Sequence, residues 1–346
     1  MAGWTQEYST NKDWANKVLR KVHETVDTPV TVRKERRKQS WLVDFLVRLV
    51  REKPLGLVGA VITLLLFLAG IFADVIMPYP FAEMHLRDAF QAPSGQHIMG
   101  TDDLGRDLFS RVVYGARISM IVGLGGATLG TILSTILGIV SGYYGGKTDL
   151  FLQRFVDSWM SFPGLFLMLS MITIIGQGMW QLIIVIGLLY GIGGSRIVRS
   201  AVIGIKENAY VQAAVATGCP PSRMLLKHIL PNVMAPIIIL FTTRLPSMIL
   251  LESTLSFLGY GIPPPTPSWG GLLGQSGRDN MLIAPWLAIW PGVAISMAVY
   301  GVNIFGDAIR DLLDPRLRGG LGRYSGAKPK ISRARRRAGI SSDNDR

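Results

Sequence analysis

The sequence predicts an all-α membrane protein with six transmembrane helices and both termini in the cytoplasm. Apolar residues make up 49% of the 346-residue chain and charged residues only 17%, although the net charge is +13. A mean hydropathy of +0.34 is too high for a soluble nucleic-acid-binding protein with that charge. One cysteine and four scattered histidines exclude a disulfide framework and a multi-cysteine metal site.

Six runs with few or no charges are long enough to cross a bilayer as helices of about 20 residues. The run 158–195 is too long for one crossing, and Gly176-Gln177-Gly178 divides it into two helices joined by a tight turn. The fifth run keeps two ionisable residues, Arg244 and Glu252. The predicted spans are 55–76, 118–142, the two halves of 158–195, 233–258 and 285–306.

The positive charges are distributed unequally between the two sides of these spans. Of the 36 Lys and Arg residues, 30 fall on the side of the termini and five on the opposite side. Because cytoplasmic segments carry the excess of Lys and Arg, this asymmetry places both termini in the cytoplasm. The net positive charge is therefore explained by orientation in the membrane, and we expect no nucleic-acid partner.

The spans divide the chain into a basic N-terminal segment (1–54), a six-helix transmembrane domain (55–309) and a basic tail (310–346). Residues 41–51 alternate apolar and charged side chains at helical spacing, which predicts an amphipathic helix on the inner membrane surface. A plain topological anchor is the alternative. The tail is expected to be disordered and to contact anionic lipid. The connecting segments within the domain are the outer loops 77–117 and 259–284 and the inner loop 196–232.

The inner loop predicts a rigid helix–turn–helix outside the membrane. Residues 207–217 favour a short Ala-rich helix, and Gly218 suits the left-handed position that ends it. Pro220 and Pro221 start a second helix at 222–230, which Pro231 is expected to close. Because Ala213 and Ala214 have small side chains, another protein can approach the backbone of this helix closely.

The spacing of Gln212-Ala213-Ala214, Gly218 and His228-Ile229-Leu230-Pro231 resembles the EAA loop of bacterial ABC importer permeases. Gln212 stands where that motif has Glu, which removes the charge for a salt bridge, and His228 stands where Ile is common. Four further stretches make residues 55–318 similar to the C-type subunit of dipeptide and oligopeptide permeases. They are 97–107 (HIMGTDDLGRD) with Ser110-Arg111 and 115–117, 252–259 (ESTLSFLG), 264–270 (PPTPSWG), and Gly306-Asp307 with 310–311 and 314–316.

The resemblance implies the type I ABC importer permease fold and a set of partners. These are a second, homologous permease subunit, two cytoplasmic ATPases and an extracytoplasmic solute-binding protein. ATP and Mg are used by the ATPases, so this chain is expected to bind no cofactor or metal and to catalyse no reaction; it contains no G-x-x-x-x-G-K-[ST] sequence. Contact with an ATPase falls, by this resemblance, on Glu207, Gln212, Ala213, Ala214, Gly218, Arg223, His228 and Pro231.

Three residues are candidates for the translocation path: Arg244, Glu252 and Trp269. Ionisable residues within a span are costly and often functional. Arg244 either lines the path and meets a peptide carboxylate, or pairs with the second permease or with Asp307. Glu252 contacts substrate, caps a helix or makes an inter-helix hydrogen bond. Trp269 follows the proline run 263–267, which is expected to be a stiff outer segment and a gate or cavity wall.

The outer motif supplies the candidates for docking the solute-binding protein: Asp102, Asp103, Arg106, Asp107 and Arg111. The structural alternative is a capped helix that feeds the second span. In that case Thr101 or Asp102 is the cap, and Asp107 and Arg111 form an i, i+4 ion pair.

The function predicted from these features is ATP-driven import of peptides by alternating access. Within the resembling family, dipeptides, longer peptides, glutathione, nickel complexes and sugars are all substrates, so the sequence leaves the solute open. A six-span ion-coupled transporter or channel is the alternative, against which stand the EAA-like loop and the scarcity of buried ionisable residues. A membrane-embedded enzyme is a third class, for which neither a metal-binding His pair nor a paired intramembrane Asp dyad is present.

Overall fold

The computed structural model describes residues 41–313, and the predictions for 1–40 and 314–346 lie outside this range. The chain divides into two compact units, residues 1–46 and 47–346. The amphipathic helix predicted at 41–51 is present as α2 (Trp41–Glu52), which begins in the first unit and ends in the second. The helices after α2 all belong to the second unit.

The regular secondary structure of the described residues is helical, apart from one isolated bridge between Thr101 and Asp107. Five of its helices are long and apolar enough to cross a membrane, and a bent pair of shorter helices makes a sixth candidate. The long helices are α3 (Pro54–Ile71), α5 (Leu108–Tyr144), α8 (Met179–Lys206), α11 (Leu230–Phe257) and α14 (Trp286–Leu313). The bent pair is α6 (Gly146–Met160) and α7 (Gly164–Ile175), with an angle of 89° between them.

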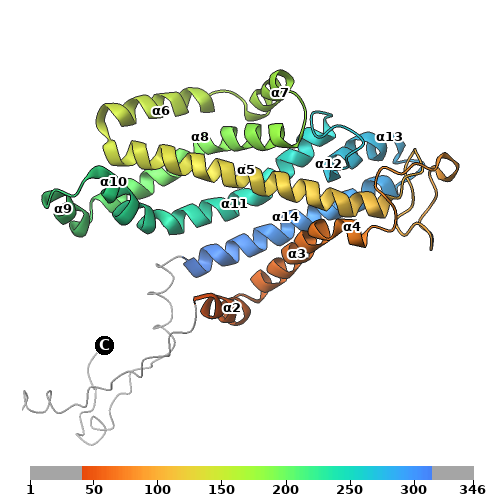
Figure 1. The fold of residues 1–346 in the computed structure, drawn as a ribbon, viewed down its shortest axis with the longest axis horizontal. Coiled ribbons are helices and arrows are strands. Elements are labelled where there is room, and N and C mark those ends of the chain that lie inside the picture. Colours follow the sequence, from red (N-terminus) through yellow and green to blue (C-terminus); the bar gives the residue numbers. More distant parts are fainter. Residues whose placement is uncertain (1–40, 314–346) are drawn as a thin grey trace, which may run out of the picture. The chain divides into compact units, whose positions relative to one another are not determined.

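Helices α5 and α8 run parallel and form the centre of the bundle (Figure 1). Small residues set their close approach: Ser134 Oγ donates to the Gly191 carbonyl over 2.7 Å, and a Cβ on Gly138 would lie 2.6 Å from Val198 Cβ. Gly126 and Gly130, predicted to allow close packing, face α8 at Ile186 and Gly187. The contacting positions on both helices increase in residue number in the same direction, so the two helices are parallel.

The parallel arrangement decides the role of α6 and α7. The chain leaves α5 at one end of the bundle and enters α8 at the other, so the bent pair must cover the length between them. This pair is the third crossing, and the turn predicted at Gly176-Gln177-Gly178 connects it to α8. The prediction of one helix for the first half of 158–195 is wrong, because this stretch contains the end of α6 and the 12-residue α7, with the 89° bend between them.

The two ends of the bundle are fixed by polar contacts. At the coupling end, as we call the end that carries residues 207–229, Lys53 Nζ lies 2.5 Å from the Asp311 carboxylate and joins the start of α3 to the end of α14. Lys206 Nζ donates to the Tyr143 carbonyl over 2.8 Å at the same end. At the opposite end, which the charge asymmetry predicts to be the outer end, the short helix α4 (Ala73–Ile76) is joined to α5 by Arg117, which lies 2.8 Å from Asp74.

Two predicted boundaries are wrong by about ten residues. Helix α5 begins at Leu108 rather than 118, and α8 continues to Lys206 rather than ending at 195, so both absorb residues assigned to loops. The predicted spans were ended near charged residues. Arg111 and Arg199 remain on the helices because each has a carboxylate partner on another segment.

Candidate functional site

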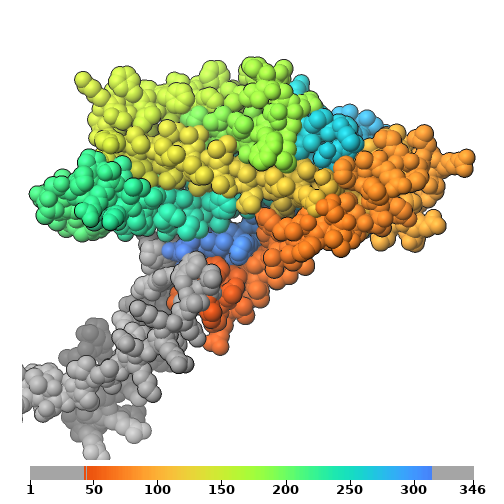
Figure 2. Space-filling model, viewed as in Figure 1, coloured from red at the N-terminus to blue at the C-terminus, as the bar shows by residue number. Residues whose placement is uncertain are grey.

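The coupling end carries the residues that resemble the EAA loop. Helix α9 (Ala209–Ala216) follows α8 after a short break, and Gly218, with φ of +78°, turns the chain. The chain continues through α10 (Pro221–Arg223) and the π-helix η2 (Met224–Ile229) into α11. Residues 206–230 protrude at the end of the bundle opposite the loop 77–107 (Figure 2).

Three buried side chains anchor this protrusion to the bundle. Val211 on α9 and Met224 and Ile229 on η2 are 1%, 0% and 0% exposed. They belong to one apolar cluster with residues of α5, α8 and α11, whose buried members are Ile139, Val198, Val202, Val233, Ile237 and Leu240. This cluster packs α9 and η2 directly against three of the long helices.

The predicted closure of the second helix by Pro231 is wrong. The helical path runs without a break from Pro221 to Phe257, with Pro231 in the first turn of α11. Within this continuous path Pro231 removes one backbone hydrogen bond, and the π-turn directly before it readjusts the neighbouring bonds. The protrusion is therefore the direct extension of a membrane helix.

Most of the predicted ATPase-contact residues are on the surface of this protrusion. Glu207, Gln212, Ala213, Gly218, Arg223 and Pro231 are exposed, and Ala214 and His228 are half-buried. Gln212 Nε2 donates to the Glu207 carbonyl over 3.2 Å. A glutamate at 212 has no hydrogen to donate, so the substitution noted in the sequence gives the helix a local hydrogen bond in place of a charge.

A groove of about 820 Å³ lies beside α9. Its wall includes Tyr143 and Tyr144 at the end of α5, Lys206 and Glu207 at the end of α8, and Gln212 on α9. A partner segment that covers α9 would also reach this groove.

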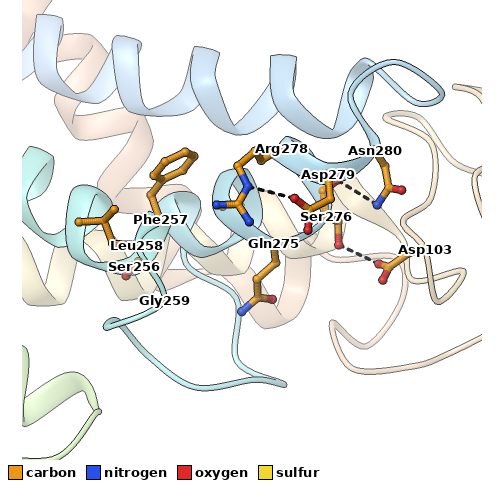
Figure 3. Close-up of a pocket in the computed structure, with 11 residues that line it drawn as sticks. Asp103, Ser256, Phe257, Leu258, Gly259, Gln275, Ser276, Arg278, Asp279 and Asn280 are labelled. Carbon is orange, nitrogen blue, oxygen red and sulfur yellow. Dashed lines mark hydrogen bonds and ion pairs between the residues drawn. The ribbon is translucent and has the colours of Figure 1, made fainter. Parts of the chain in front are cut away.

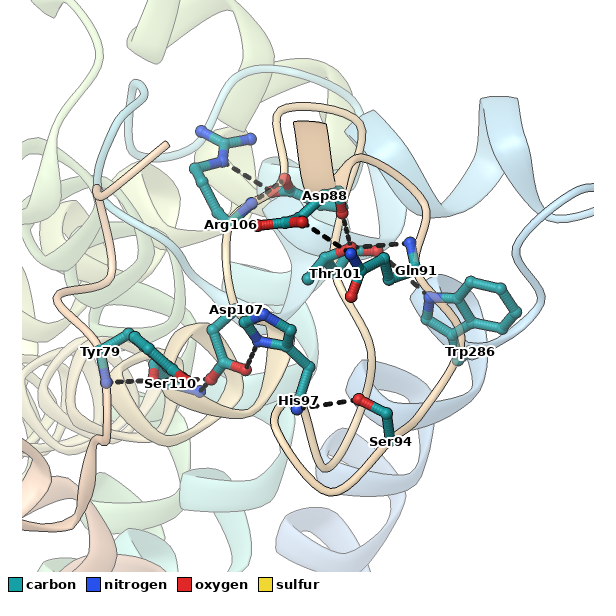
Figure 4. A network of polar contacts seen from close by, with 11 residues as sticks. Tyr79, Asp88, Gln91, Ser94, His97, Thr101, Arg106, Asp107, Ser110 and Trp286 are labelled. Carbon is teal, nitrogen blue, oxygen red and sulfur yellow. Dashed lines mark hydrogen bonds and ion pairs between the residues drawn. The ribbon is translucent and has the colours of Figure 1, made fainter. Parts of the chain in front are cut away.

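The outer motif is a buried polar network (Figure 4). Asp102 accepts from the Arg106 Nε over 2.6 Å, and Asp107 accepts from the Ser110 backbone N–H over 2.8 Å and lies 2.9 Å from His97 Nδ1. The cap of α5 is therefore Asp107, and the prediction of Thr101 or Asp102 as the cap is wrong. The predicted Asp107–Arg111 pair is also wrong, because Arg111 faces Asp102 at 3.5 Å.

Burial separates the five docking candidates into two groups. Asp102, Arg106, Asp107 and Arg111 have side chains at most 6% exposed, whereas Asp103 is 40% exposed. Asp103 accepts from Ser276 Oγ over 2.7 Å at the edge of a pocket of about 400 Å³ (Figure 3). The pocket's other polar residues are Ser256, Gln275, Arg278, Asp279 and Asn280.

Glu252 and Trp269 are fully buried between helices. Glu252 on α11 accepts from Ser119 of α5 over 2.8 Å and from Ser256 over 2.7 Å, which is the inter-helix hydrogen bond considered from the sequence. Trp269 begins the short helix α12 (Trp269–Leu272), and its Nε1 donates to the Val112 carbonyl over 2.9 Å. Both side chains pack the bundle in this structure, and their place in a path stays a prediction.

Arg244, at the middle of α11, turns toward α8. Its guanidinium donates to the Tyr190 carbonyl and lies 5.8 Å from the centre of the Tyr190 ring. Pairing with Asp307, one of the alternatives considered from the sequence, is not formed: within residues 41–313 the Arg244 guanidinium contacts Tyr190 instead. Contact with α8 replaces that pair.

The comparisons with known proteins agree with this architecture. Residues 134–319 match the family described as binding-protein-dependent transport system inner membrane component. The chain belongs to this family. Residues 40–93 match the N-terminal transmembrane domain of oligopeptide transport permease C. The chain is therefore a multi-pass inner-membrane protein, the permease subunit of an ABC importer.

Three similar proteins are named for the transport of different solutes. The chain is 38% identical to the dipeptide transport system permease of Alkalihalophilus pseudofirmus over 78% of this chain and 88% of that one. It is 37% identical to the oligopeptide transport system permease of Bacillus subtilis, with the same coverage. It is 35% identical to the glutathione transport system permease of Pectobacterium atrosepticum, over 80% of this chain and 91% of that one.

Sequence reasoning missed two features of the permease. His97 was treated as one of four scattered histidines. It is only 6% exposed, and its Nδ1 lies 2.9 Å from the Asp107 carboxylate. Arg196 was assigned to a loop, yet it lies on α8 and pairs with Asp157 of α6. The available signal for Arg196 was the pattern of apolar residues at helical spacing beyond 195, which continues to Ile205.

Proposed function

We propose that this permease moves dipeptides and short oligopeptides across the inner membrane, delivered by an extracytoplasmic binding protein and driven by ATP. The observation that carries the proposal is the coupling end, where an exposed helix of small residues is anchored on the extension of a membrane helix. The relatives named for dipeptide and oligopeptide transport support the solute class. The peptide is a compact polar solute that requires a water-filled path rather than lipid.

The proposed assembly contains a second homologous permease, two ATPases and the binding protein. Helix α9 fits a groove of one ATPase, because Ala213 is exposed and carries no side chain beyond Cβ. ATP and Mg bind the ATPases, and this chain carries no catalytic residue. Closure of the ATPases displaces α9, and the cluster of Val211, Met224 and Ile229 carries the displacement to α5, α8 and α11. The two packings of these helices are the states of alternating access.

At the outer end, we propose that the binding protein contacts the exposed rim rather than the buried motif. Asp103 and the pocket residues Arg278 and Asp279 offer charges of both signs to a partner. The buried members of the motif, Asp102, Arg106, Asp107 and Arg111, hold this rim in place.

Uptake by the reconstituted complex tests the function. The complex of both permeases and both ATPases in proteoliposomes, with its binding protein, is expected to accumulate a labelled dipeptide only when ATP and Mg are supplied to the ATPases. Uptake driven by an ion gradient without ATP would instead support the secondary-transporter class. Mass spectrometry of the solute retained by the binding protein identifies the substrate, and a solute that is not a peptide would overturn the peptide assignment.

A coupling variant sharpens this test. Ala213→Arg adds a large side chain to the exposed face of α9 without filling any internal space. We expect it to leave the folding of the permease unchanged while uptake and transport-stimulated ATP hydrolysis fall about tenfold or more, since a misfit of a few kcal/mol at an interface suffices. Leu86→Arg, at a position 71% exposed in the loop 77–107 at the opposite end of the bundle, is the matched control and is expected to keep wild-type uptake. Equal uptake by the Ala213 variant and the wild type would contradict docking through α9.

A further inference from the structure

A polar pocket of about 400 Å³ lies at the end of the bundle that the charge asymmetry predicts to be outer (Figure 3). Its lining comes from three parts of the chain: Asp103 in the loop before α5, residues 256–259 at the end of α11, and residues 274–280. Seven of the eleven lining residues carry a polar or charged side chain. The volume is within the range of small-molecule sites, and the lining suits a polar solute rather than a lipid chain.

The walls of this pocket are mounted on α11. The π-helix η3 (Leu273–Gly277) lies directly against the last turn of α11, because a Cβ on Gly274 would be only 2.3 Å from the Phe257 carbonyl oxygen. Ser276 of η3 donates to the Asp103 carboxylate over 2.7 Å and joins this wall to the loop before α5. These contacts fix the lining, so little ordering cost remains for a bound molecule.

The pocket presents charges of opposite sign on two different segments. Arg278, at the start of α13 (Arg278–Asn280), donates through Nε to the Asp279 carboxylate over 2.9 Å. Its two terminal nitrogens make no hydrogen bond within residues 41–313, so both can donate to a carboxylate. Asp103 receives the Ser276 hydroxyl on Oδ1, which leaves Oδ2 for an ammonium group. In Figure 3 the Arg278 and Asp103 side chains lie on either side of Ser276.

Neither charge is held by a strong internal ion pair. Arg278 and Asp279 have side chains 61% and 62% exposed, and an ion pair between exposed neighbours contributes little. Arg106 Nη2 lies 3.7 Å from Asp103, but the Arg106 guanidinium is bonded to Asp102 at 2.6 Å. A ligand that carries both charges can therefore bind both residues without breaking a buried contact.

We propose that this pocket is a reception site for the solute, in which Arg278 binds the free carboxylate of a short peptide and Asp103 binds its ammonium group. This inference rests on the proposed transport of peptides. Arg278 and Asp103 also belong to the rim that the binding protein is proposed to contact, so a peptide is released next to the pocket. Ser276 positions the Asp103 carboxylate, and Asp279 orients the Arg278 guanidinium through Nε.

Direct binding of a dipeptide to the assembled complex tests the carboxylate contact. Radiolabelled alanyl-alanine and its C-terminal amide are each equilibrated with the solubilised complex of both permeases and both ATPases, without binding protein or ATP. We expect saturable binding of the dipeptide. Arg278→Gln should weaken binding of the acid about fivefold and of the amide less than about twofold, because only the acid offers a carboxylate to the guanidinium.

Arg87→Gln is the matched control for this variant. Arg87 is exposed in the same outer loop as Asp103 but does not line the pocket, so its replacement should leave both affinities unchanged. Equal weakening of the acid and the amide by Arg278→Gln, or no weakening of either, would overturn the carboxylate contact.

Asp103→Asn tests the other end of the peptide in the same assay. The variant keeps an acceptor for Ser276 and removes the charge. It should weaken binding of alanyl-alanine about fivefold and of its N-acetyl form less than about twofold. If neither variant changes peptide binding, and both change only the concentration of binding protein that half-saturates ATP hydrolysis, the pocket serves docking alone and the inference is overturned.

Uptake by the same complex separates this inference from the proposed function. ATP-driven accumulation of the dipeptide by a complex that shows no saturable binding at the pocket would overturn the reception site and leave the proposed function standing. Selective binding at the pocket of a complex that hydrolyses ATP but accumulates no peptide would overturn the proposed function and leave the peptide site.

Discussion

Glu252 shows how a single ionisable residue can be kept inside a membrane helix. Its carboxyl group is fully buried and is surrounded by the hydroxyls of Ser119, Ser253 and Ser256. Three donors supply what water would otherwise supply, and one of them belongs to a different helix. The residue therefore joins α5 to α11 near the outer end.

Replacing Glu252 tests this role. Glu252→Ala leaves three buried hydroxyls without their acceptor and is expected to lower the free energy of unfolding by about 1–3 kcal/mol. Glu252→Gln keeps the size and one acceptor oxygen, so its loss should be smaller. Thermal unfolding of the purified complex, followed by tryptophan fluorescence, measures the difference. A Gln variant as unstable as the Ala variant would show that charge, not hydrogen bonding, is what the site requires.

At the scale of elements, the parallel pair α5 and α8 is the part of the permease most dependent on small residues. Positions 130, 134, 138 and 142 of α5 meet positions 187, 191, 195–198 and 202 of α8, each one turn further along. Packing of small residues lets the two backbones approach where lipid gives no hydrophobic driving force. The same contact runs from the buried core to the coupling end.

A pair of glycine substitutions tests this contact. Gly138→Ala places a methyl group 2.6 Å from Val198 Cβ and is expected to destabilise the permease by about 1–3 kcal/mol. Gly204→Ala, also on a helix of this pair, meets nothing within 4 Å and should be neutral or stabilising by up to about 1 kcal/mol. The unfolding temperatures of the two variants should therefore move in opposite directions from each other or differ clearly in size. Equal values would contradict the close approach at Gly138.

At the scale of the whole molecule, the number of crossings decides the topology. Because α5 and α8 are parallel, the bent pair α6–α7 returns the chain across the membrane, and the six crossings bring the end of α14 back to the side where α3 begins. The ion pair of Lys53 with Asp311 agrees with this arrangement. If the bent pair were re-entrant, the coupling end would lie on the opposite side from the start of α3.

Reporter fusions test the orientation predicted by the charge asymmetry. Fusions of a reporter that fluoresces only in the cytoplasm are expected to be active at residue 53, within 212–218 and after 313. A fusion at residue 95, in the loop before α5, should be inactive. Activity at 95 with inactivity at 53 would reverse the orientation, and unequal activity at 53 and 313 would contradict six crossings.

The sequence by itself determined that the chain is helical, that it crosses the membrane repeatedly and that a short helix lies within 207–217 and ends before Gly218. Hydrophobic runs, glycine and proline positions are local signals, so they are readable without a fold. The turn at 176–178 and the position of Gly218 were predicted correctly for that reason. The spacing of the residues in the EAA-like loop can also be read directly from the sequence.

Only the tertiary structure decided where the polar residues of the spans lie. Arg111, Arg196 and Arg199 lie on helices that extend beyond the ends predicted from their charges, because each has a carboxylate partner on a different segment of the chain. Asp102 and Asp107 are buried rather than presented to a partner, and Arg244 faces Tyr190 rather than Asp307. A charge in a membrane protein is placed by what compensates it, and compensation is a long-range contact that a local pattern does not contain.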